Sequence, residues 1–262
     1  MLMNAMFVVI GIVALALGVF ALRFYLGLRE MTLSETGRVN DEVFCIKERV
    51  VNTYIFRGKQ GYLMVDAGMC ERTVKRELGK LGIDPAQITD IVLTHADGDH
   101  VDALGLFKNA KVYMHRDEEQ MINGKTGKFP LVKFKWKWGA YTLFDGDETL
   151  SLAGLTVRVF HAPGHTPGSC SFLIGTDYLA TGDHLSYKNG RFGVVPDIFN
   201  MDTRAQEVSI RKLPTPETMK FVLTSHYGVI ENGKPARIQV AAPAFDGHSA
   251  PVAPGSMKGK PS

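Results

Sequence analysis

The sequence predicts a layered α/β domain that is preceded by a membrane-spanning helix. Three observations lead to this prediction: a long apolar run at the N-terminus, strand patterns that alternate with helix patterns after residue 43, and four strands that each end at a histidine or an aspartate. Alternation of strands and helices favours stacked layers over a helix bundle. The 262 residues are enough for one large domain or two small ones.

The first predicted element is a membrane anchor at residues 1–29. Residues 1–22 contain no Asp, Glu, Lys or Arg, and the apolar run Ala5–Leu22 is close to the ~20 residues that span a bilayer. A cleaved signal peptide is the alternative, but it would need a basic start and an evident small-residue cleavage site. Arg23 and Arg29 follow the run, so the positive-inside rule places the following domain in the cytoplasm. A periplasmic or extracellular domain is the alternative.

The rest of the chain divides into three segments. Residues 30–42 are polar and show no period, so we expect a linker. Residues 43–237 hold the strand and helix patterns and form the main domain. Residues 238–262 are rich in Ala, Pro, Gly and Ser, which predicts a disordered tail.

Within the main domain, strands are predicted where short apolar or alternating runs are bounded by turn residues. They cover residues 43–46, 50–56, 62–65, 91–94, 111–115, 155–160, 171–174, 178–181 and 221–224. A helix is predicted at 71–81, where Val74, Leu78 and Leu81 recur at helical spacing. Further helices are predicted at 101–107 and from a cap at Asp202 to about 213, and residues 185–201 are expected to form a loop.

The segment Val132–Trp138 alternates between apolar and lysine residues. One interpretation is a wall that presents Trp136 and Trp138 to a substrate, or a basic strip for nucleic acid or anionic lipid. The other is an edge strand whose aromatic face packs inward while its lysines prevent further pairing.

Composition narrows the classes of partner. The net charge of +3 does not indicate a nucleic-acid partner, and none is expected. The three cysteines form no CxxC pair, so we expect buried thiols in a reducing compartment rather than a disulfide framework.

The most informative segment is Thr94–His100, which reads THADGDH. It places two imidazoles and two carboxylates within seven residues, directly after an apolar strand pattern. Such crowded polar groups are usually neutralised by a divalent cation. The cluster therefore predicts a metal site.

Four predicted strands end near a possible metal ligand, namely His95, His165, Asp183 and His226. A single histidine at such a place is more often structural, but four such endings together indicate one functional site. His161 and His184 flank these ligands. Each is either a supporting or substrate-facing group or a hydrogen-bonded loop histidine, and we take His184 as a supporting group. His115 and His248 are weaker candidates for a functional role.

These motifs resemble those of the metallo-β-lactamase-fold hydrolases. Asp66-Ala-Gly68 resembles the first family motif, and His95-x-Asp97-x-Asp99-His100 resembles the HxHxDH motif. Three segments of this chain resemble the third, fourth and fifth family motifs: APGHTPGS around His165, TGD around Asp183 and TSHYG around His226. The resemblance implies a four-layer αββα sandwich with a two-metal site along one edge.

The resemblance also implies a role for each residue. The first metal would be held by His95, His165 and Asp97, the second by Asp99, His100 and His226, and Asp183 would bridge both. Asp66 would support the ligand-bearing loop without binding metal. Asp99 and Asp183 are the expected catalytic carboxylates.

Asp97 departs from the family pattern, because a histidine usually stands there. Four histidines and three aspartates carry a charge of −3, where the usual set carries −2. More oxygen ligands favour iron or manganese relative to zinc. We therefore expect two divalent metal ions, with zinc as the leading candidate and iron or manganese as alternatives. The alternative for Asp97 is that it is too short to reach the metal, in which case the first site would bind metal weakly or stay empty.

The resemblance implies hydrolysis of a small-molecule ester, thioester or lactone, as in the glyoxalase II and lactonase branch, by hydroxide held at the metals. A phosphodiesterase or nuclease of the same fold is one alternative. A diiron redox protein or a non-catalytic metal-binding membrane protein is another. The sequence does not define an oligomeric state.

Overall fold

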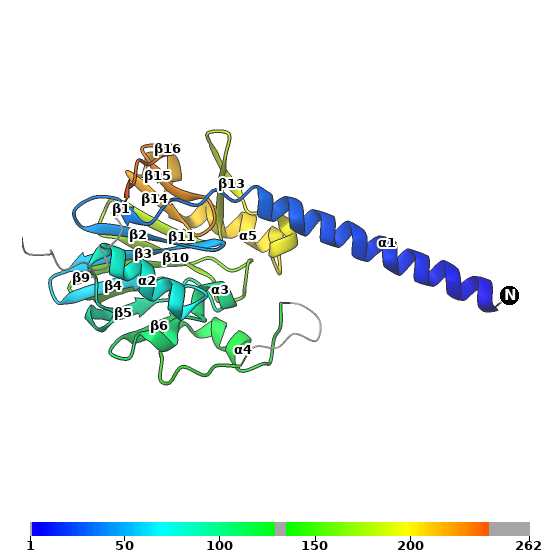
Figure 1. Cartoon of the computed structure of the whole chain (residues 1–262), viewed down its shortest axis with the longest axis horizontal. Coiled ribbons are helices and arrows are strands. Elements are labelled where there is room, and N and C mark those ends of the chain that lie inside the picture. Colours follow the sequence, from blue (N-terminus) through cyan, green and yellow to red (C-terminus); the bar gives the residue numbers. More distant parts are fainter. Residues whose placement is uncertain (1, 129–134, 241–262) are drawn as a thin grey trace, which may run out of the picture.

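The computed structural model describes residues 2–128 and 135–240. Two stacked β-sheets form its centre, and helices lie on their outer faces (Figure 1). These stacked layers are the layered α/β architecture that the sequence predicts.

The first sheet has eight strands in the order β17-β1-β2-β3-β4-β5-β6-β7. Their bounds are β1 Gly37–Arg38, β2 Val43–Glu48, β3 Val51–Gly58, β4 Gly61–Val65, β5 Ile88–Val92, β6 Lys111–His115, β7 Thr142–Phe144 and β17 Gln239–Val240. Strands β4 to β7 pair in parallel, and the other neighbours in this sheet are antiparallel.

The second sheet has seven strands in the order β16-β15-β14-β11-β10-β9-β8. Their bounds are β8 Thr149–Leu152, β9 Leu155–His161, β10 Cys170–Ile174, β11 Tyr178–Gly182, β14 Phe221–Thr224, β15 Gly228–Glu231 and β16 Lys234–Pro235. A separate hairpin consists of β12 Leu185–Lys188 and β13 Arg191–Val194.

The helices are α1 Leu2–Arg29, α2 Glu71–Leu81, α3 Gly98–Val101, α4 Glu119–Ile122 and α5 Thr203–Ser209. Short 3₁₀ turns are η1 Pro85–Gln87, η2 Leu104–Leu106, η3 Arg116–Glu118, η4 Asp197–Phe199, η5 Ile210–Lys212 and η6 Pro216–Thr218.

Strand periodicity explains the layers. Successive side chains of a strand point to opposite faces. In β2, Val43 and Cys45 join the core between the two sheets, while Phe44 and Ile46 join a second core that includes Val74 and other residues of α2. Because both faces of this strand are covered, its residues are almost all buried.

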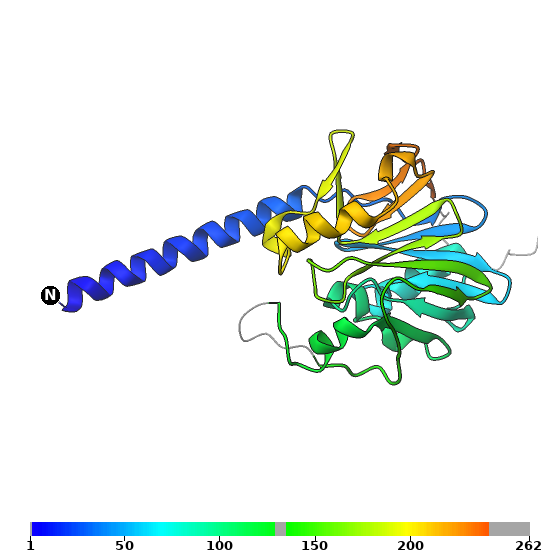
Figure 2. The ribbon, with the colours of Figure 1, turned by 180° about the vertical axis from the view of Figure 1, so that it is seen from behind.

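Helix α1 extends away from the sandwich, with the N-terminus at its far end (Figures 1 and 2). Apart from Arg23, its residues from Met6 to Leu26 carry no charge, and its large hydrophobic side chains in this range are mostly exposed. Within the described residues, Met6–Arg29 is the helix long and apolar enough to cross a membrane, and a signal sequence has the same properties.

Several predicted loop regions contain strands. Within residues 185–201, residues 185–194 form the β12–β13 hairpin, whose turn Asn189-Gly190 has positive φ at both residues, as type I′ turns require. Asn232-Gly233 makes the same kind of turn between β15 and β16. The Asn-Gly pairs were visible signals, so the prediction of a loop at 185–201 is wrong.

Three other boundaries differ from the prediction. Strand β1 lies in the expected linker, and β17 lies at the start of the expected tail; the two pair with each other. The expected helix at 101–107 is split into α3 and η2, since the chain turns after Asp102 and the Ala103 N–H donates to Gly68 O at 2.9 Å. Residues 241–262, including His248, and Val132–Phe134 lie outside the described residues.

Candidate metal centre

All seven candidate ligands lie together where strands from both sheets end. Strand β5 of the first sheet leads to the segment His95–His100, while β9, β11 and β14 of the second sheet lead to His165, Asp183 and His226. Gly182 allows the two sheets to approach here, because a Cβ at this glycine would lie 2.7 Å from the side chain of Thr94.

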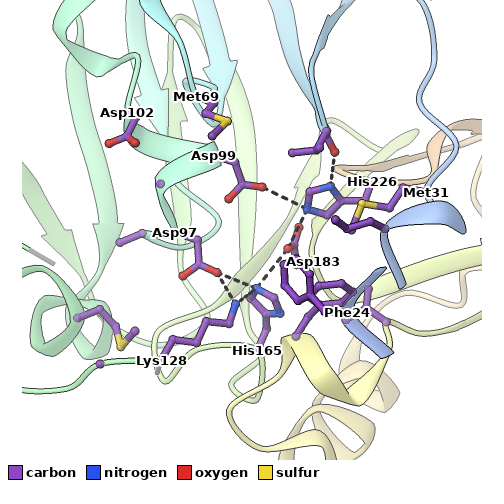
Figure 3. A pocket seen from close by; sticks show the side chains of 18 of the residues that line it. Phe24, Met31, Met69, Asp97, Asp99, Asp102, Lys128, His165, Asp183 and His226 are labelled. Carbon is purple, nitrogen blue, oxygen red and sulfur yellow. Dashed lines mark hydrogen bonds and ion pairs between the residues drawn. The ribbon is translucent and has the colours of Figure 1, made fainter. Parts of the chain in front are cut away.

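Asp183 lies at the middle of the cluster (Figure 3). Its Oδ2 is 3.2 Å from His165 Nε2, 3.1 Å from His226 Nε2 and 3.9 Å from His95 Nε2. Its Oδ1 is 3.3 Å from His100 Nε2. One carboxylate therefore contacts or approaches all four histidines.

The other two carboxylates separate the cluster into two halves. Asp97 Oδ2 lies 3.4 Å from His95 Nε2 and 3.2 Å from His165 Nε2. Asp99 Oδ2 lies 3.7 Å from His100 Nε2 and 3.5 Å from His226 Nε2. These two halves match the two ligand sets that the sequence predicts, which remain a proposal.

Each of the four histidines is oriented by an oxygen at its Nδ1. The partners are Thr94 Oγ1 for His95 at 3.0 Å, Asp66 Oδ2 for His100 at 2.9 Å, Asn200 Oδ1 for His165 at 3.1 Å and Val50 O for His226 at 2.5 Å. When Nδ1–H donates to these oxygens, the lone pair is on Nε2. All four Nε2 atoms then present lone pairs to the cluster, which is the arrangement that metal-binding histidines need.

The centre of the cluster fits a cation. His95 Nε2, His100 Nε2 and Asp183 Oδ1 are buried and have no hydrogen-bond partner among the residues that the structure describes. Burial lowers the pKa of His95 to about 3, so it stays neutral. Burial also acts to lower the pKa of His100 and His226, but Asp183 and Asp99 outweigh it and raise both values. Protons on these rings supply positive charge where a metal would otherwise supply it.

Asp66 holds the ligand-bearing loop, as predicted for it. Its Oδ1 accepts from Thr94 N and its Oδ2 from Thr94 Oγ1, both at 2.8 Å, in addition to the bond with His100. His184 has no such direct role. Its ring bonds to Ser171 Oγ at 2.8 Å and Ala162 O at 2.6 Å, and it supports the chain that leads to His165.

A second buried carboxylate, Glu118, was missed in the sequence. Its Oε1 accepts from Ala96 N at 2.8 Å, and its Oε2 accepts from Thr166 Oγ1 at 2.7 Å and Gly168 N at 2.9 Å. It therefore joins the loop between the ligands His95 and Asp97 to the loop after His165. No local motif marks it, because its partners lie at least 22 residues away.

A lysine enters the first half of the cluster. The Lys128 ammonium donates to Asp97 Oδ2, and its Nζ lies 2.7 Å from His165 Nε2 (Figure 3). In the sequence it appeared only as one lysine of a glycine-containing loop. Burial acts to raise the pKa of Asp97, but Lys128 and His95 outweigh it and hold the value well below its usual range.

The cluster lies in a cavity of about 400 Å³. Its polar lining includes Asp97, Asp99, Asp102, Lys128, His165, Asp183 and His226, and its apolar lining includes Phe24, Leu28, Met31, Met69, Met121, Val195 and Phe199.

Trp136 and Trp138 do not line this cavity. They pack against each other and Tyr141, beside the core that contains α2. The Trp136 indole donates to Gly139 O at 2.7 Å, so it is fixed by the local turn. The prediction that they form a substrate wall is therefore wrong, and the part of the strip that the structure describes, Lys135–Trp138, is not a strand.

His161 and His115 lie outside the cluster and stack on each other, with ring centroids 3.8 Å apart. With Asp117 they form a further group of three possible ligand atoms. The backbone N–H groups of Asp117 and Gly146 lie 3.1 and 3.0 Å from Nδ1 and Nε2 of His115, and the neutral ring can accept from one of them. This local contact accounts for His115 as a structural histidine.

Two stacked sheets with a histidine and aspartate cluster at one edge define an α/β protein with a metal centre. A model of the metallo-beta-lactamase superfamily matches residues 46–226. The chain belongs to this superfamily.

Relatives agree with this assignment. A probable metallo-hydrolase of Methanocaldococcus jannaschii is 28% identical over 164 residues, 63% of this chain and 69% of that protein. A hydroxyacylglutathione hydrolase of Aeromonas hydrophila is 32% identical over 136 residues, 50% of this chain and 45% of that protein. An N-acyl homoserine lactonase of a Bacillus species is 25% identical over 154 residues, 47% of this chain and 58% of that protein.

The solved Rm3 metallo-beta-lactamase has the same fold. It superposes with a TM-score of 0.59 at 15% identity, covering 77% of this chain and 81% of that chain. At this identity the likeness concerns the fold alone.

Proposed function

We propose that the protein is a metal-dependent hydrolase of a small-molecule ester, thioester or lactone. The observation that carries the proposal is the convergence of four histidine Nε2 atoms and three carboxylates in one cluster, part of which lines a cavity. The relatives that are named as a hydroxyacylglutathione hydrolase and a lactonase support this substrate class, as the sequence motifs do. Zinc is the first candidate, with iron or manganese as alternatives.

A bound divalent metal would supply Lewis acidity and a more acidic water. Asp99, His100, His226 and Asp183 would hold it. Asp183 is nearly buried, with 8% of its side chain exposed, so its role is to hold cation charge inside the cluster. Asp99 is 25% exposed and faces the cavity. Asp99 is therefore the carboxylate placed to orient a water molecule and accept its proton.

The basic strip gives no support to the phosphodiesterase alternative, because Lys135 and Lys137 are not among the residues that line the cavity. Helix α1 supports a membrane-anchored enzyme, and the two arginines after its apolar run support a cytoplasmic site.

The test is hydrolysis by the purified full-length protein after metal loading, with a thioester, a lactone and a bis-aryl phosphodiester as substrates. We expect turnover of a thioester or lactone, and at least a hundredfold loss of kcat in Asp99→Asn, the scale of general acid–base catalysis. Asp177→Asn is the control, because Asp177 lies at the β10–β11 turn with 43% of its side chain exposed. Turnover of the phosphodiester alone, or full activity in Asp99→Asn, would contradict the proposal.

A further inference from the structure

The first half of the cluster already contains a positive charge. The Lys128 ammonium donates to Asp97 Oδ2 and lies 2.7 Å from His165 Nε2. These are two of the three atoms that would hold the first metal, since Asp97, His165 and His95 form that ligand group. The Lys128 side chain is only 14% exposed, so the ammonium is inside the site rather than at its rim.

A metal and this ammonium compete for the same lone pair. The Nδ1 of His165 faces Asn200 Oδ1, which leaves one lone pair, on Nε2. That lone pair can accept a proton from Lys128 or bind a metal, but it cannot do both. Two cations that share Asp97 Oδ2 would also repel each other inside a poorly solvated site.

The second half of the cluster has no such competitor. Among the described residues, the ion pairs of Asp99 and Asp183 are all with histidines, and no Lys or Arg reaches them. The buried atoms without partners, His100 Nε2 and Asp183 Oδ1, lie 3.3 Å apart at this half. A single cation there satisfies both.

We propose that the protein binds one divalent metal, in the half formed by Asp99, His100, His226 and Asp183, and that Lys128 takes the place of the other metal. Asp97, which stands where the family usually has histidine, and Lys128 then act together, because the aspartate supplies the anion that holds the ammonium. Lys128 lines the cavity beside Asp183. Its N–H groups are therefore placed to donate to negative charge that develops on a substrate oxygen. This inference rests on the proposed function for its chemistry but not for its test.

The test is the number of metal ions bound. Full-length protein is saturated with zinc, passed through a desalting column and measured by elemental analysis, and cobalt(II) titration followed by absorbance gives an independent count. We expect one equivalent in the wild type. We expect two in Lys128→Met, where a neutral side chain of similar length frees Asp97 and His165. Lys125→Ala, an exposed lysine of the same loop, should stay at one.

The outcomes separate the two proposals. Two equivalents in the wild type, or one in Lys128→Met with native circular dichroism, would overturn the role of Lys128 and leave the hydrolase proposal standing. No bound metal in the wild type would refute the metal-dependent hydrolase itself.

A different observation concerns the apolar side of the cavity, which is formed in part by the last turns of α1. Phe24, Leu28 and Met31 line it. The helix is fastened there: Arg23 makes two hydrogen bonds to Asp197, at 2.7 and 2.8 Å, and the Phe24 ring meets Phe199 at 5.3 Å. The exposed apolar part of α1 begins directly beyond this contact (Figure 2).

We infer that the substrate is an amphiphile whose apolar acyl chain lies along Phe24 and Leu28 and enters from the bilayer surface. An apolar helix surface continues into the wall of the cavity, so an acyl chain can remain covered from the membrane to the metal centre. This inference also rests on the proposed function.

The test compares butanoyl and dodecanoyl thioesters for the full-length protein in phosphatidylcholine vesicles. We expect a higher kcat/KM for the dodecanoyl thioester than for the butanoyl thioester. The ratio of the two values should fall about tenfold in Phe24→Ala/Leu28→Ala, as the loss of ~1.4 kcal/mol of apolar contact predicts. Leu17→Ala, an exposed residue elsewhere on α1, should keep it. An unchanged preference in the double variant would overturn the inference. A preference that is equal with vesicles and with dissolved substrate would exclude entry from the bilayer. Absence of activity on both thioesters and on the lactone of the first test would instead refute the proposed function.

Discussion

The contact between Asp66 and His100 permits a sharp prediction about metal affinity. Asp66 accepts three hydrogen bonds, two from Thr94 and one from His100 Nδ1. In Asp66→Asn, one oxygen becomes an NH₂ group, which can be placed in two ways. At the Oδ1 position it faces the N–H of Thr94, and two donors then oppose each other. At the Oδ2 position it donates to His100 Nδ1, and the ring must carry its proton on Nε2.

The second placement also affects the neighbouring ligand. The Thr94 hydroxyl loses its acceptor and turns toward His95 Nδ1, 3.0 Å away. Both rings then point an N–H group at the cation site. We expect metal affinity to fall by about 10- to 100-fold, the usual effect of removing an outer partner of a ligand histidine, or about 1.4–2.7 kcal/mol. The backbone does not oppose the change, because Asp66 has φ of 58° and asparagine tolerates this region.

The assay is zinc competition against a chromophoric chelator. Asp90→Asn is a matched control: Asp90 is a buried carboxylate of β5 that accepts from Ala153 N at 3.0 Å and Thr89 Oγ1 at 2.8 Å, away from the metal cluster. It should lose stability and keep its zinc affinity. A dissociation constant for Asp66→Asn within twofold of the wild type would refute the reasoning about ring protonation.

Three further predictions use other parts of the site. Burial raises the pKa of Glu118 from 4.5 to about 7, so the protonated side chain stabilises the fold fully below pH 4.5, and this stabilisation is lost as the pH rises to about 7. In urea unfolding of the metal-free protein, the free energy of unfolding should therefore fall by about 3 kcal/mol across this range. Glu118→Gln should not show this fall. Gly168→Ala should lower the free energy of unfolding by about 3 kcal/mol, because a Cβ there would lie 2.2 Å from Glu118 N, while Gly79→Ala on the open face of α2 should raise it by about 0.5–1 kcal/mol. Removal of metal by EDTA should abolish hydrolysis. It should also lower the free energy of unfolding by about 4 kcal/mol relative to protein in a free metal concentration of 1,000 times the dissociation constant. Unchanged calorimetric scans would contradict this.

The sequence was sufficient to predict the layers and to bring the seven candidate ligands to one place. Each ligand follows a recognisable strand, and strand ends on one edge of a sandwich must meet. His95, His165, Asp183 and His226 needed no other information. The same local logic failed where turn chemistry was overlooked, as at Asn189-Gly190, and where short strands pair over a long range, as β1 does with β17.

Glu118 and Lys128 could not be found in this way. Glu118 ends the short turn η3 after β6 and resembles an ordinary surface acid in the sequence, while Lys128 lies in a loop with Lys125. Their importance comes from partners 22 to 50 residues away, which depends on how two sheets and a loop pack. The contact between α1 and the cavity is non-local for the same reason, since Arg23 and Asp197 are 174 residues apart.

Asp97 and Lys128 should be energetically coupled, and their coupling can be measured. Four neutral histidines, three aspartates and Lys128 carry −2, so one divalent metal brings the site to zero. Asp97→His alone would remove the carboxylate that holds the Lys128 ammonium and would leave this ammonium beside uncharged imidazole rings. We expect this single variant to bind metal poorly, and Asp97→His/Lys128→Met to bind two zinc ions more tightly than either single variant predicts. A double-mutant cycle on zinc affinity gives the interaction energy, and contacting charged residues typically couple by 0.5–3 kcal/mol. If the two changes add without coupling, the aspartate and the lysine serve separate purposes, and Asp97 would have to be explained as a metal ligand instead.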